Sequence, residues 1–292
     1  MEKLRRSMLF VPGGNEKIFS KALGLDADAL ILDLEDAVAL ERKEEARDFV
    51  EKRLGETDFG HKEKVVRINP LESPFGYPDL CAVVPARPDA LVVPKVNSVR
   101  DVWLVDGIVT QIERARRMPE GGIKLILLIE TVLSVLNAVD IASCTPRVSG
   151  LLFGPADLTL ETRGSITAER QELNYAMSRI VMAARAAGVD AIDQPHLDVR
   201  DAEGNVRAAR QARDFGFDGK ACIHPSQIAA INQAFTPSKE DIEFSRRVIK
   251  AFRQASAEGK GAVQVDGKLV EILHVQMAER VLKIAAMAGV CD

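Results

Sequence analysis

The sequence lacks the features that mark several classes of protein. Its cysteines are few and show no paired spacing typical of a zinc site; they are Cys81, Cys144, Cys222 and Cys291. No apolar run approaches the roughly 20 residues that a membrane span needs. The amino-terminal segment MEKLRRSMLFVPGG has no long apolar stretch and no cleavage site, so it is not expected to be a secretory signal. These absences predict a cytoplasmic protein with reduced cysteines and no membrane span.

A strong charge of either sign is also missing. The formal net charge is only −4, and lysines, arginines and acids are mixed along the chain. Nucleic-acid and membrane-surface partners are therefore not expected. Apolar residues, by contrast, are plentiful and make up 47% of the 292 positions. This content is enough for a sizeable core, in one large domain or two small ones.

Short apolar runs alternate with longer amphipathic stretches. Most of the runs are almost continuously apolar, as expected of strands that are buried on both faces. The eight runs cover residues 7–12, 29–36, 64–69, 90–96, 124–131, 148–158, 190–196 and 219–225. Helices are expected between them, for instance at 40–54, 99–117 and 168–187. Eight strands over about 230 residues favour an α/β fold of the (β/α)8 TIM-barrel type. A doubly wound sheet would alternate in the same way and stays an alternative.

The pattern changes after Ser226. Residues 238–260 are expected to form one helix, with Ser238 as N-cap and Asp241 in its first turn. Asp266 and Gly267 then stand between two apolar runs, which indicates a hairpin, and a last helix is expected at about 274–288. We therefore predict a catalytic barrel domain over residues 1–235 and a C-terminal helix–hairpin–helix extension over residues 236–292.

Polar residues collect where the predicted strands end. They are Asp33, Glu35 and Asp36 after the second strand, Arg67 and Asn69 after the third, and Lys95, Glu130, Asp157, Asp193, Gln194, His196 and His224 after later ones. In a TIM barrel the carboxyl ends of the strands form the mouth at which chemistry takes place. Several unpaired acids at one mouth would repel one another, and a divalent cation would relieve this. Glu130 and Asp157 are candidate ligands, and hard oxygen ligands suit Mg²⁺ better than Zn²⁺. An ordinary salt bridge, or a helix cap at Asp157, is the alternative.

Arg67 is a candidate holder of a substrate carboxylate, because its planar fork can bind both oxygens. It could also pair with Asp33 or Asp36, and both roles can hold at once. The segment FGPA places Gly154, Pro155 and Ala156 before an expected helix start. Free backbone N–H groups there could bind a substrate carboxylate, or the segment could be a plain loop.

Three other residues have the chemistry of catalytic groups but weaker sequence support. His196 and His224 could act as general bases. A structural role is favoured for both, and Pro225 after His224 suits the first position of a helix. Lys95 could form a Schiff base, although the surrounding VPKV alone is weak support and a metal-dependent enolate chemistry would not need one.

The motifs SMLFVPGGNEKIFSKALGLDADALILDLEDAV, RIN, VPKV, LIET, GLLFGPADLT and DFGFDGKACIHPSQIAAINQAFTPS occur in this order. Together they resemble the citrate lyase β-subunit-like family of acyl-CoA lyases, from about Arg6 to Ala288. The resemblance implies a TIM barrel, Mg²⁺, and reversible carbon–carbon cleavage of a carboxylated 3-hydroxyacyl-CoA such as citramalyl-CoA, malyl-CoA or citryl-CoA. The products would be acetyl-CoA, or propionyl-CoA, and a 2-oxo acid.

The resemblance also implies roles for single residues. Glu130 and Asp157 would bind the metal, and Arg67 would bind the oxo-acid carboxylate and polarise its carbonyl. Glu35 and Asp36 would orient metal-bound waters. Members of the family form homo-oligomers, often trimers or hexamers, in which the C-terminal extension closes over a neighbour's site.

This chain departs from the family pattern in the predicted hairpin. Many members carry VDGKMIDAP there, with the second Asp as the acid/base residue. This chain has VDGKLVEIL, which places Glu271 at that position. Glutamate can transfer the same proton, and a solvated hairpin residue is the alternative.

The CoA phosphates of such a substrate would need basic partners near the rim of the barrel. Arg5, Arg6 and Lys17 are candidates, with plain surface charge as the alternative. Three other functions also stay open. They are a pyruvate–aldehyde aldolase without CoA, a carrier-dependent citrate lyase β subunit, and a non-catalytic paralogue that binds the same ligands.

Overall fold

The computed structural model describes residues 3–290, which form two compact units. The larger unit spans Arg5–Asn232, and the smaller one joins residues 3–4 to the chain from Gln233 onward. The boundary falls inside helix α10 (Pro225–Phe235), three residues before the boundary expected from the sequence. Within the described residues, no helix is both long and apolar enough to cross a membrane.

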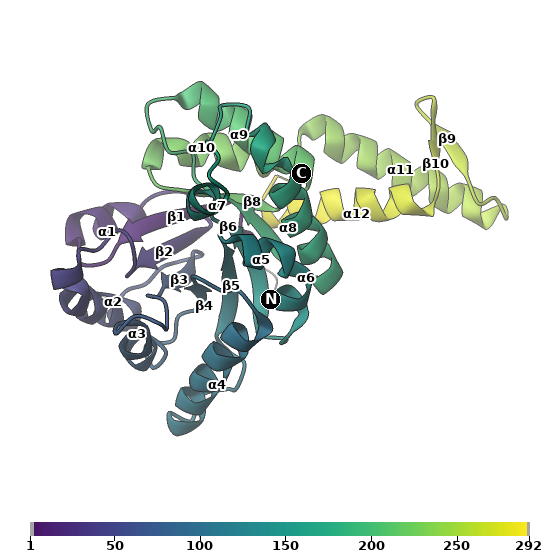
Figure 1. Cartoon of the computed structure of the whole chain (residues 1–292). Helices are drawn as coiled ribbons and strands as arrows, with labels where there is room; N and C mark the ends of the chain where they lie inside the picture. Colours follow the sequence, from purple (N-terminus) through teal and green to yellow (C-terminus); the bar gives the residue numbers. More distant parts are fainter. Residues whose placement is uncertain (1–2, 291–292) are drawn as a thin grey trace. The chain divides into compact units, whose positions relative to one another are not determined.

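The larger unit is a closed barrel of eight parallel strands (Figure 1). The strands are β1 (Ser7–Pro12), β2 (Ala29–Asp33), β3 (Glu63–Arg67), β4 (Ala90–Val93), β5 (Lys124–Ile129), β6 (Val148–Phe153), β7 (Asp190–Asp193) and β8 (Gly219–Cys222). Closure is made by the pairing of β1 with β8, where Ser7 lies opposite Lys220. The predicted TIM barrel is therefore confirmed, and the doubly wound sheet is wrong, because an open sheet would leave β1 and β8 unpaired.

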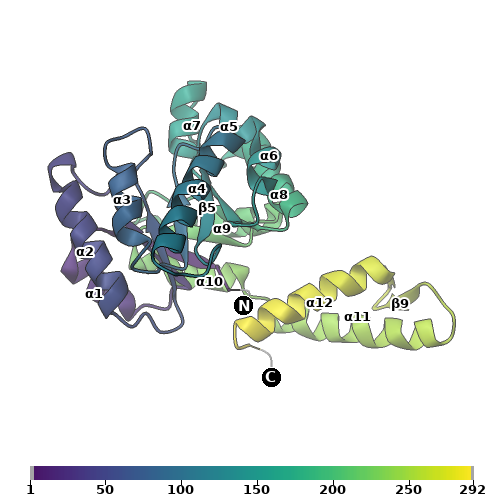
Figure 2. The ribbon, with the colours of Figure 1, turned by 90° about the horizontal axis from the view of Figure 1, so that it is seen from below.

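Helices surround the barrel on the outside (Figures 1 and 2). They are α1 (Glu16–Leu23), α2 (Lys43–Glu56), α3 (Gly76–Val83), α4 (Val99–Ala115), α5 (Val132–Leu136), α6 (Ala138–Ser143), α7 (Pro155–Thr162), α8 (Asn174–Ala187), α9 (Ala202–Phe215) and α10, with short 3₁₀ turns at Leu40–Arg42 and Gln171–Leu173. The helix expected at 168–187 begins only at Asn174. Arg170, just ahead of it, has a positive φ of 57°, which no helix interior accommodates.

Alternate residues of each strand fill the inside of the barrel. This core consists of Met8, Ala29, Ile31, Val65, Ala90, Val92, Ile126, Leu128, Leu152, Ile192 and Ala221, with Phe10 packed against it. Arg5 lies just before β1 and is buried. Its guanidinium contacts Glu63 at 2.8 Å, Asp190 at 3.0 Å and the carbonyl oxygen of Ser149 at 2.8 Å. Glu63 and Asp190 begin their strands, so this network lies at the amino-terminal end of the barrel, and the opposite end holds the candidate site.

A buried ion cluster lies on the other face of strands β7 and β8. Ile192 and Ala221 face the barrel interior, so their neighbours Asp193 and Lys220 point away from it. The Lys220 ammonium donates to Asp193 Oδ2 at 2.6 Å, and Arg170 Nη1 and Nη2 donate to the same carboxylate at 3.0 and 2.5 Å. Asp193 was expected at the mouth because it ends a strand. It instead balances two buried cations.

The smaller unit is a helix, a hairpin and a helix, as predicted. Helix α11 (Lys239–Ala257) starts with the expected capping box, in which Ser238 Oγ accepts from the Asp241 N–H at 3.1 Å. Strands β9 (Val263–Val265) and β10 (Lys268–Val270) meet at a turn formed by Asp266 and Gly267, with φ of 49° and 79°. Positive φ at both positions is the geometry of a type I′ turn. Helix α12 (Ile272–Met287) lies beside α11 in both views (Figures 1 and 2).

Candidate active site

A cavity of about 450 Å³ opens at the carboxyl end of the barrel strands. Its charged lining side chains are Asp33, Asp36, Arg67, Glu130 and Asp157. They come from β2, β3 and the segments that follow β2, β5 and β6, so residues more than 100 positions apart meet here. The arrangement confirms that the polar ends of these strands face one space.

Arg67 is held on several sides. Its Nε and Nη2 donate to the two oxygens of Asp33 at 2.7 and 2.6 Å, and its Nη1 donates to Asp36 at 3.1 Å. Nη1 also lies 3.0 Å from Glu35 Oε2. The guanidinium carbon stands 4.9 Å from the centre of the Phe10 ring. The pairing expected for Arg67 is therefore confirmed, while its contact with a substrate carboxylate stays a prediction.

Asp33 does more than balance Arg67. Its carboxylate also accepts from the backbone N–H groups of Glu35 at 2.9 Å and Ala37 at 3.2 Å. One buried carboxylate thus shapes the loop that carries Glu35 and Asp36 and orients the guanidinium. From the sequence, Asp33 was placed at the strand end and proposed only as a possible partner of Arg67. The signal was a charged residue continuous with a fully buried strand.

We expect Asp33→Asn to leave the guanidinium of Arg67 less firmly oriented. The substitution leaves a buried guanidinium with one carboxylate fewer, and it should lower the free energy of unfolding by about 2–3 kcal/mol and raise the KM for an oxo acid about 10-fold. Urea unfolding and steady-state kinetics measure the two effects.

Asp36→Asn is the matched control, because Asp36 binds the same guanidinium with a side chain that is 79% exposed. Its loss should cost under about 1 kcal/mol. Equal destabilisation by the two substitutions would contradict the positioning role of Asp33.

Glu35 lies beside the Arg67–Asp33 ion pair and is buried, which disfavours a charged carboxylate. Burial raises the pKa of its carboxyl to about 8; Arg67 opposes the rise, whereas Asp36, Glu130 and Asp33 add to it. Oε2 is buried and makes no hydrogen bond within the described residues. Carboxyl groups whose pKa is raised in this way often exchange protons at active sites.

Glu130 and Asp157 face each other across one cation. Lys95 Nζ lies 3.6 Å from Glu130 Oε1 and is also hydrogen-bonded to Asp157 Oδ2, and the Lys95 N–H donates to Glu130 Oε1 at 2.7 Å. Burial raises the pKa of Glu130 to about 7, Lys95 opposes this rise, and the Asp157 charge adds to it. A pair of carboxylates that attracts a cation is a suitable donor set for Mg²⁺. Residues 3–290 contain no group of three or more such side chains around one point, so water or substrate would complete the coordination.

The backbone around Asp157 explains why Gly154 is needed. A Cβ at Gly154 would lie 2.8 Å from Glu130 Cβ, closer than two carbon atoms can approach. Strand β6 ends at Phe153 and helix α7 begins at Pro155. Asp157 is therefore in the first turn of a helix, not in the strand expected to run to residue 158.

The expected anion-binding segment is corrected by the same geometry. Pro155 has no N–H, and the Gly154 N–H already donates to the carbonyl oxygen of Ile129 at 2.9 Å. Only Ala156 of the three predicted residues has a backbone N–H that could bind a substrate carboxylate. Gly154 and Pro155 instead shape the approach to it.

The prediction that Arg5 and Arg6 bind CoA phosphates at the rim is wrong. Both precede β1, at the amino-terminal end of the barrel, whereas the cavity is at the carboxyl end. Arg5 is enclosed in the network described above, and the Arg6 side chain donates to Asp28 at 2.8 and 3.0 Å. Lys17 lies exposed in α1, which follows the carboxyl end of β1, and its role toward CoA stays a prediction.

The remaining candidates lie as follows. His196 Nε2 is 3.4 Å from Asp201 Oδ2, and His224 Nδ1 is 2.8 Å from Ser226 Oγ. Glu271 is half-buried in the smaller unit, just before α12, and its N–H donates to His274 Nδ1 at 3.1 Å. The role of Glu271 in proton transfer stays a prediction.

Sequence reasoning assigned no role to Gln194, which lines the cavity. The residue is 7% exposed, and within residues 3–290 its side-chain amide has no hydrogen-bond partner. A nearly buried amide that faces a cavity without a partner is available to a ligand. The only sequence signal was its place directly after Asp193 at a strand end.

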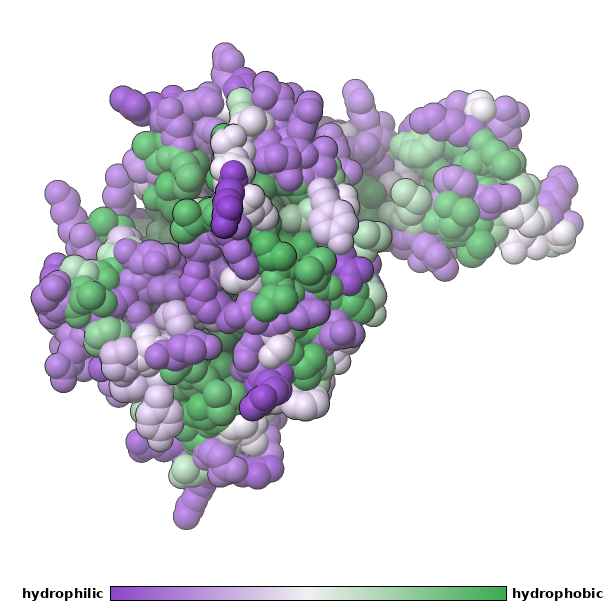
Figure 3. All heavy atoms as spheres, in the orientation of Figure 1, coloured by the Kyte–Doolittle hydropathy of each residue, from purple (hydrophilic) through white to green (hydrophobic). Residues whose placement is uncertain are grey.

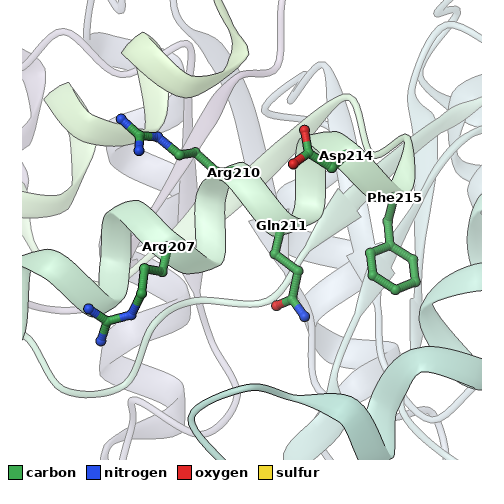
Figure 4. Close-up of a pocket in the computed structure, with 5 residues that line it drawn as sticks. All are labelled: Arg207, Arg210, Gln211, Asp214 and Phe215. Carbon is green, nitrogen blue, oxygen red and sulfur yellow. The ribbon is translucent and has the colours of Figure 1, made fainter.

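A second hollow of about 650 Å³ lies against helix α9 (Figure 4). It is lined by Arg207, Arg210, Gln211, Asp214 and Phe215. These residues belong to one helix outside the barrel and include no pair of carboxylates. On the face seen in Figure 3, hydrophilic side chains predominate and apolar ones form separate patches. The cavity at the barrel mouth is therefore the candidate active site.

Comparison with known proteins agrees with this architecture. The model of the HpcH/HpaI aldolase/citrate lyase family matches residues 6–225, and a model of carbon–carbon bond lyases of the TIM-barrel fold matches residues 175–290. A (3S)-malyl-CoA thioesterase of Cereibacter sphaeroides is 37% identical over 97% of this chain and 96% of its own length. The citrate lyase subunit beta of Leuconostoc mesenteroides is 37% identical over 97% of this chain and 94% of its own length.

Solved structures give the same result. CitE of Mycobacterium tuberculosis, in complex with magnesium, acetoacetate and coenzyme A, has a TM-score of 0.79 at 31% identity, over 97% of this chain and 98% of its own. A citrate lyase of Burkholderia xenovorans has a TM-score of 0.86 at 25% identity, over 99% of this chain and 94% of its own. The chain belongs to the HpcH/HpaI aldolase/citrate lyase family and is a lyase with the TIM-barrel fold.

Proposed function

We propose that this lyase uses Mg²⁺ to cleave or form the carbon–carbon bond of a carboxylated 3-hydroxyacyl-CoA, with acetyl-CoA and a 2-oxo acid as the other side of the reaction. The observation that carries the proposal is the shared cavity of an acid pair, Glu130 and Asp157, and an oriented guanidinium, Arg67. The magnesium and coenzyme A in the related CitE structure support the choice of metal and thioester.

Glu130 and Asp157 would hold the metal. When bound, Mg²⁺ would act as a Lewis acid on the oxo group of the 2-oxo acid. Lys95 now neutralises both carboxylates, so it would have to release Asp157 as the metal enters. Glu35 and Asp36 lie beside the site and are proposed to orient its water molecules.

Arg67 is proposed to bind the carboxylate of the oxo acid. Three of its five N–H groups are donated to Asp33 and Asp36, and Nη1 also lies 3.0 Å from Glu35, which leaves the second Nη2 N–H for a ligand. The bond to the exposed Asp36 is also easily exchanged for one to substrate. Because Asp33 holds the guanidinium in place beforehand, little side-chain entropy is lost when the substrate binds.

When the carbon–carbon bond breaks, the 3-hydroxyl group gives its proton to a base, and the thioester enolate that forms takes up a proton from an acid. We propose Glu271 of a neighbouring copy as the acid that supplies it. Residues 236–292 would then act as a lid over a neighbour's barrel, in a homotrimer or hexamer. Without the lid, residues 1–235 would bind the oxo acid but turn over slowly.

The test is a product assay with citramalyl-CoA, malyl-CoA and citryl-CoA. A lyase releases a 2-oxo acid and leaves the thioester intact, whereas a thioesterase, the activity named for one relative, releases free thiol. We expect oxo acid without thiol, loss of turnover in EDTA, and recovery on addition of Mg²⁺. Full activity in EDTA would contradict the metal assignment. Release of thiol without an oxo acid would indicate that the protein hydrolyses the thioester and does not cleave the carbon–carbon bond.

The same assay separates the remaining alternatives. Cleavage only of free 4-hydroxy-2-oxo acids would indicate a CoA-independent pyruvate aldolase. Cleavage only of a carrier-bound thioester would indicate a citrate lyase β subunit. Tight binding of oxo acid and CoA without turnover would indicate a non-catalytic paralogue.

A further inference from the structure

The charge of the cavity bears on which oxo acid it accepts. Its lining carries four carboxylates, those of Asp33, Asp36, Glu130 and Asp157. Among residues 3–290, Arg67 is the single cation that lines the cavity, and two of these carboxylates are already paired with it. Lys95, which contacts the other two, is the second cation close by. Carboxylates thus outnumber cations around the cavity, and a divalent metal would offset this excess.

The rest of the wall offers almost nothing to a second anion. Of the thirteen other lining residues, Gln194 alone has a polar side chain. Apolar groups from β1, β5, β6 and the segments after β7 and β8 form most of this wall, including Phe10, Leu128, Leu152, Leu197 and Ile223. A neutral amide can donate one hydrogen bond to a carboxylate, but it cannot balance its charge.

We infer that the site selects a monocarboxylic 2-oxo acid, with hydrogen or a small alkyl group beside the oxo carbon rather than a carboxymethyl group. This inference rests on the proposed function and deepens it. One substrate carboxylate is accounted for by Arg67 and the Ala156 N–H. A second would face apolar side chains and acids, where no further cation lines the cavity to balance its charge.

Two thioesters form a matched pair for this inference. Citramalyl-CoA carries a methyl group where citryl-CoA carries a carboxymethyl group, and the two are otherwise the same at the reacting carbons. Their CoA portions are identical, so any difference arises at the oxo-acid end. We expect kcat/KM for citramalyl-CoA or malyl-CoA to exceed that for citryl-CoA by at least about 100-fold, since an uncompensated charge costs several kcal/mol and each 1.4 kcal/mol is tenfold.

The experiment measures kcat/KM for all three thioesters with saturating Mg²⁺. A citryl-CoA value within about tenfold of the better of the other two would overturn the inference while leaving the lyase function intact. Absence of carbon–carbon cleavage for all three would remove the proposed function instead. The two failures are therefore distinguishable.

Calorimetry of the Mg²⁺-loaded protein supplies a readout that does not depend on turnover. Pyruvate, 2-oxobutyrate and freshly dissolved oxaloacetate are titrated in turn. We expect the first two to bind at least about tenfold more tightly than oxaloacetate, because 2-oxobutyrate resembles oxaloacetate in length but lacks its second charge. If 2-oxobutyrate binds as weakly as oxaloacetate, size and not charge excludes the dicarboxylate, and the inference is wrong.

Discussion

Glu130→Gln is expected to lower kcat/KM by about 1,000-fold or more, because it removes one of two carboxylates proposed to hold the metal at the reacting oxo group. The substitution keeps the shape of the side chain and the oxygen that accepts the Lys95 N–H. Affinity for Mn²⁺, followed by electron paramagnetic resonance, should fall at least about 100-fold. Both effects share one cause, the loss of an anionic oxygen ligand.

The variant should nevertheless fold. Burial raises the pKa of Glu130 to about 7 in the folded protein, above its value in the unfolded chain. The protonated carboxyl therefore contributes most to stability below the unfolded pKa, and this contribution is lost as the pH rises through about 7. A neutral glutamine has no such pH-dependent loss of stability. The metal-free variant should therefore be at least as stable as the wild type at pH 8. Glu161→Gln, the same change at an exposed position of α7, is the control and should keep full activity. Unchanged Mn²⁺ affinity in Glu130→Gln would rule Glu130 out as a ligand.

Glu271→Gln is expected to lower kcat by 10²- to 10⁴-fold, the usual contribution of a general acid. Binding of pyruvate should not change, because the oxo acid is proposed to contact Arg67 and not the lid. Glu271→Asp restores the residue common in the family and should retain turnover. The exposed Glu258→Gln in the same unit is the control. A normal kcat in Glu271→Gln would remove this residue from the mechanism.

Mixed oligomers test whether Glu271 acts on a neighbour. Glu271→Gln and Arg67→Ala are each expected to be inactive alone. Co-expressed with different tags and purified through both, they would place an intact barrel beside an intact lid in about one third of the sites of a trimer or about one quarter of the sites of a hexamer. We expect activity near that fraction of the wild-type value. Activity no higher than that of the parents would contradict a lid supplied in trans.

Several features of the fold were predictable because they depend on local patterns. Apolar runs, most of them almost continuous, marked the eight strands, and their number indicated a barrel. Ser238 with Asp241, and Asp266 with Gly267, marked the start of α11 and the hairpin turn, since capping and turn geometry depend on neighbouring residues alone. Glu130, Asp157 and Arg67 could be proposed as one site, because the carboxyl ends of parallel strands meet at one mouth.

Other features could not be predicted because they depend on partners far along the chain. Arg5 looked like a basic residue near a strand, and only closure of the barrel brings Glu63 and Asp190 around it. Asp193 looked like a mouth residue, and only the pairing of β7 with β8 sets it opposite Lys220. Gln194 became a candidate once the cavity showed its amide to be without a partner.

By itself, the sequence determined the order and kind of the elements, the end of the barrel at which chemistry collects, and the acids available there. These follow from hydrophobic periodicity and from the direction of each strand, which the chain carries locally. Only the tertiary structure decided which charges neutralise one another. Ion pairing depends on distances of about 3 Å between side chains that the sequence places tens to hundreds of residues apart. That pairing assigns Asp33 to Arg67 and Asp193 to Lys220, and leaves Glu130 and Asp157 around Lys95.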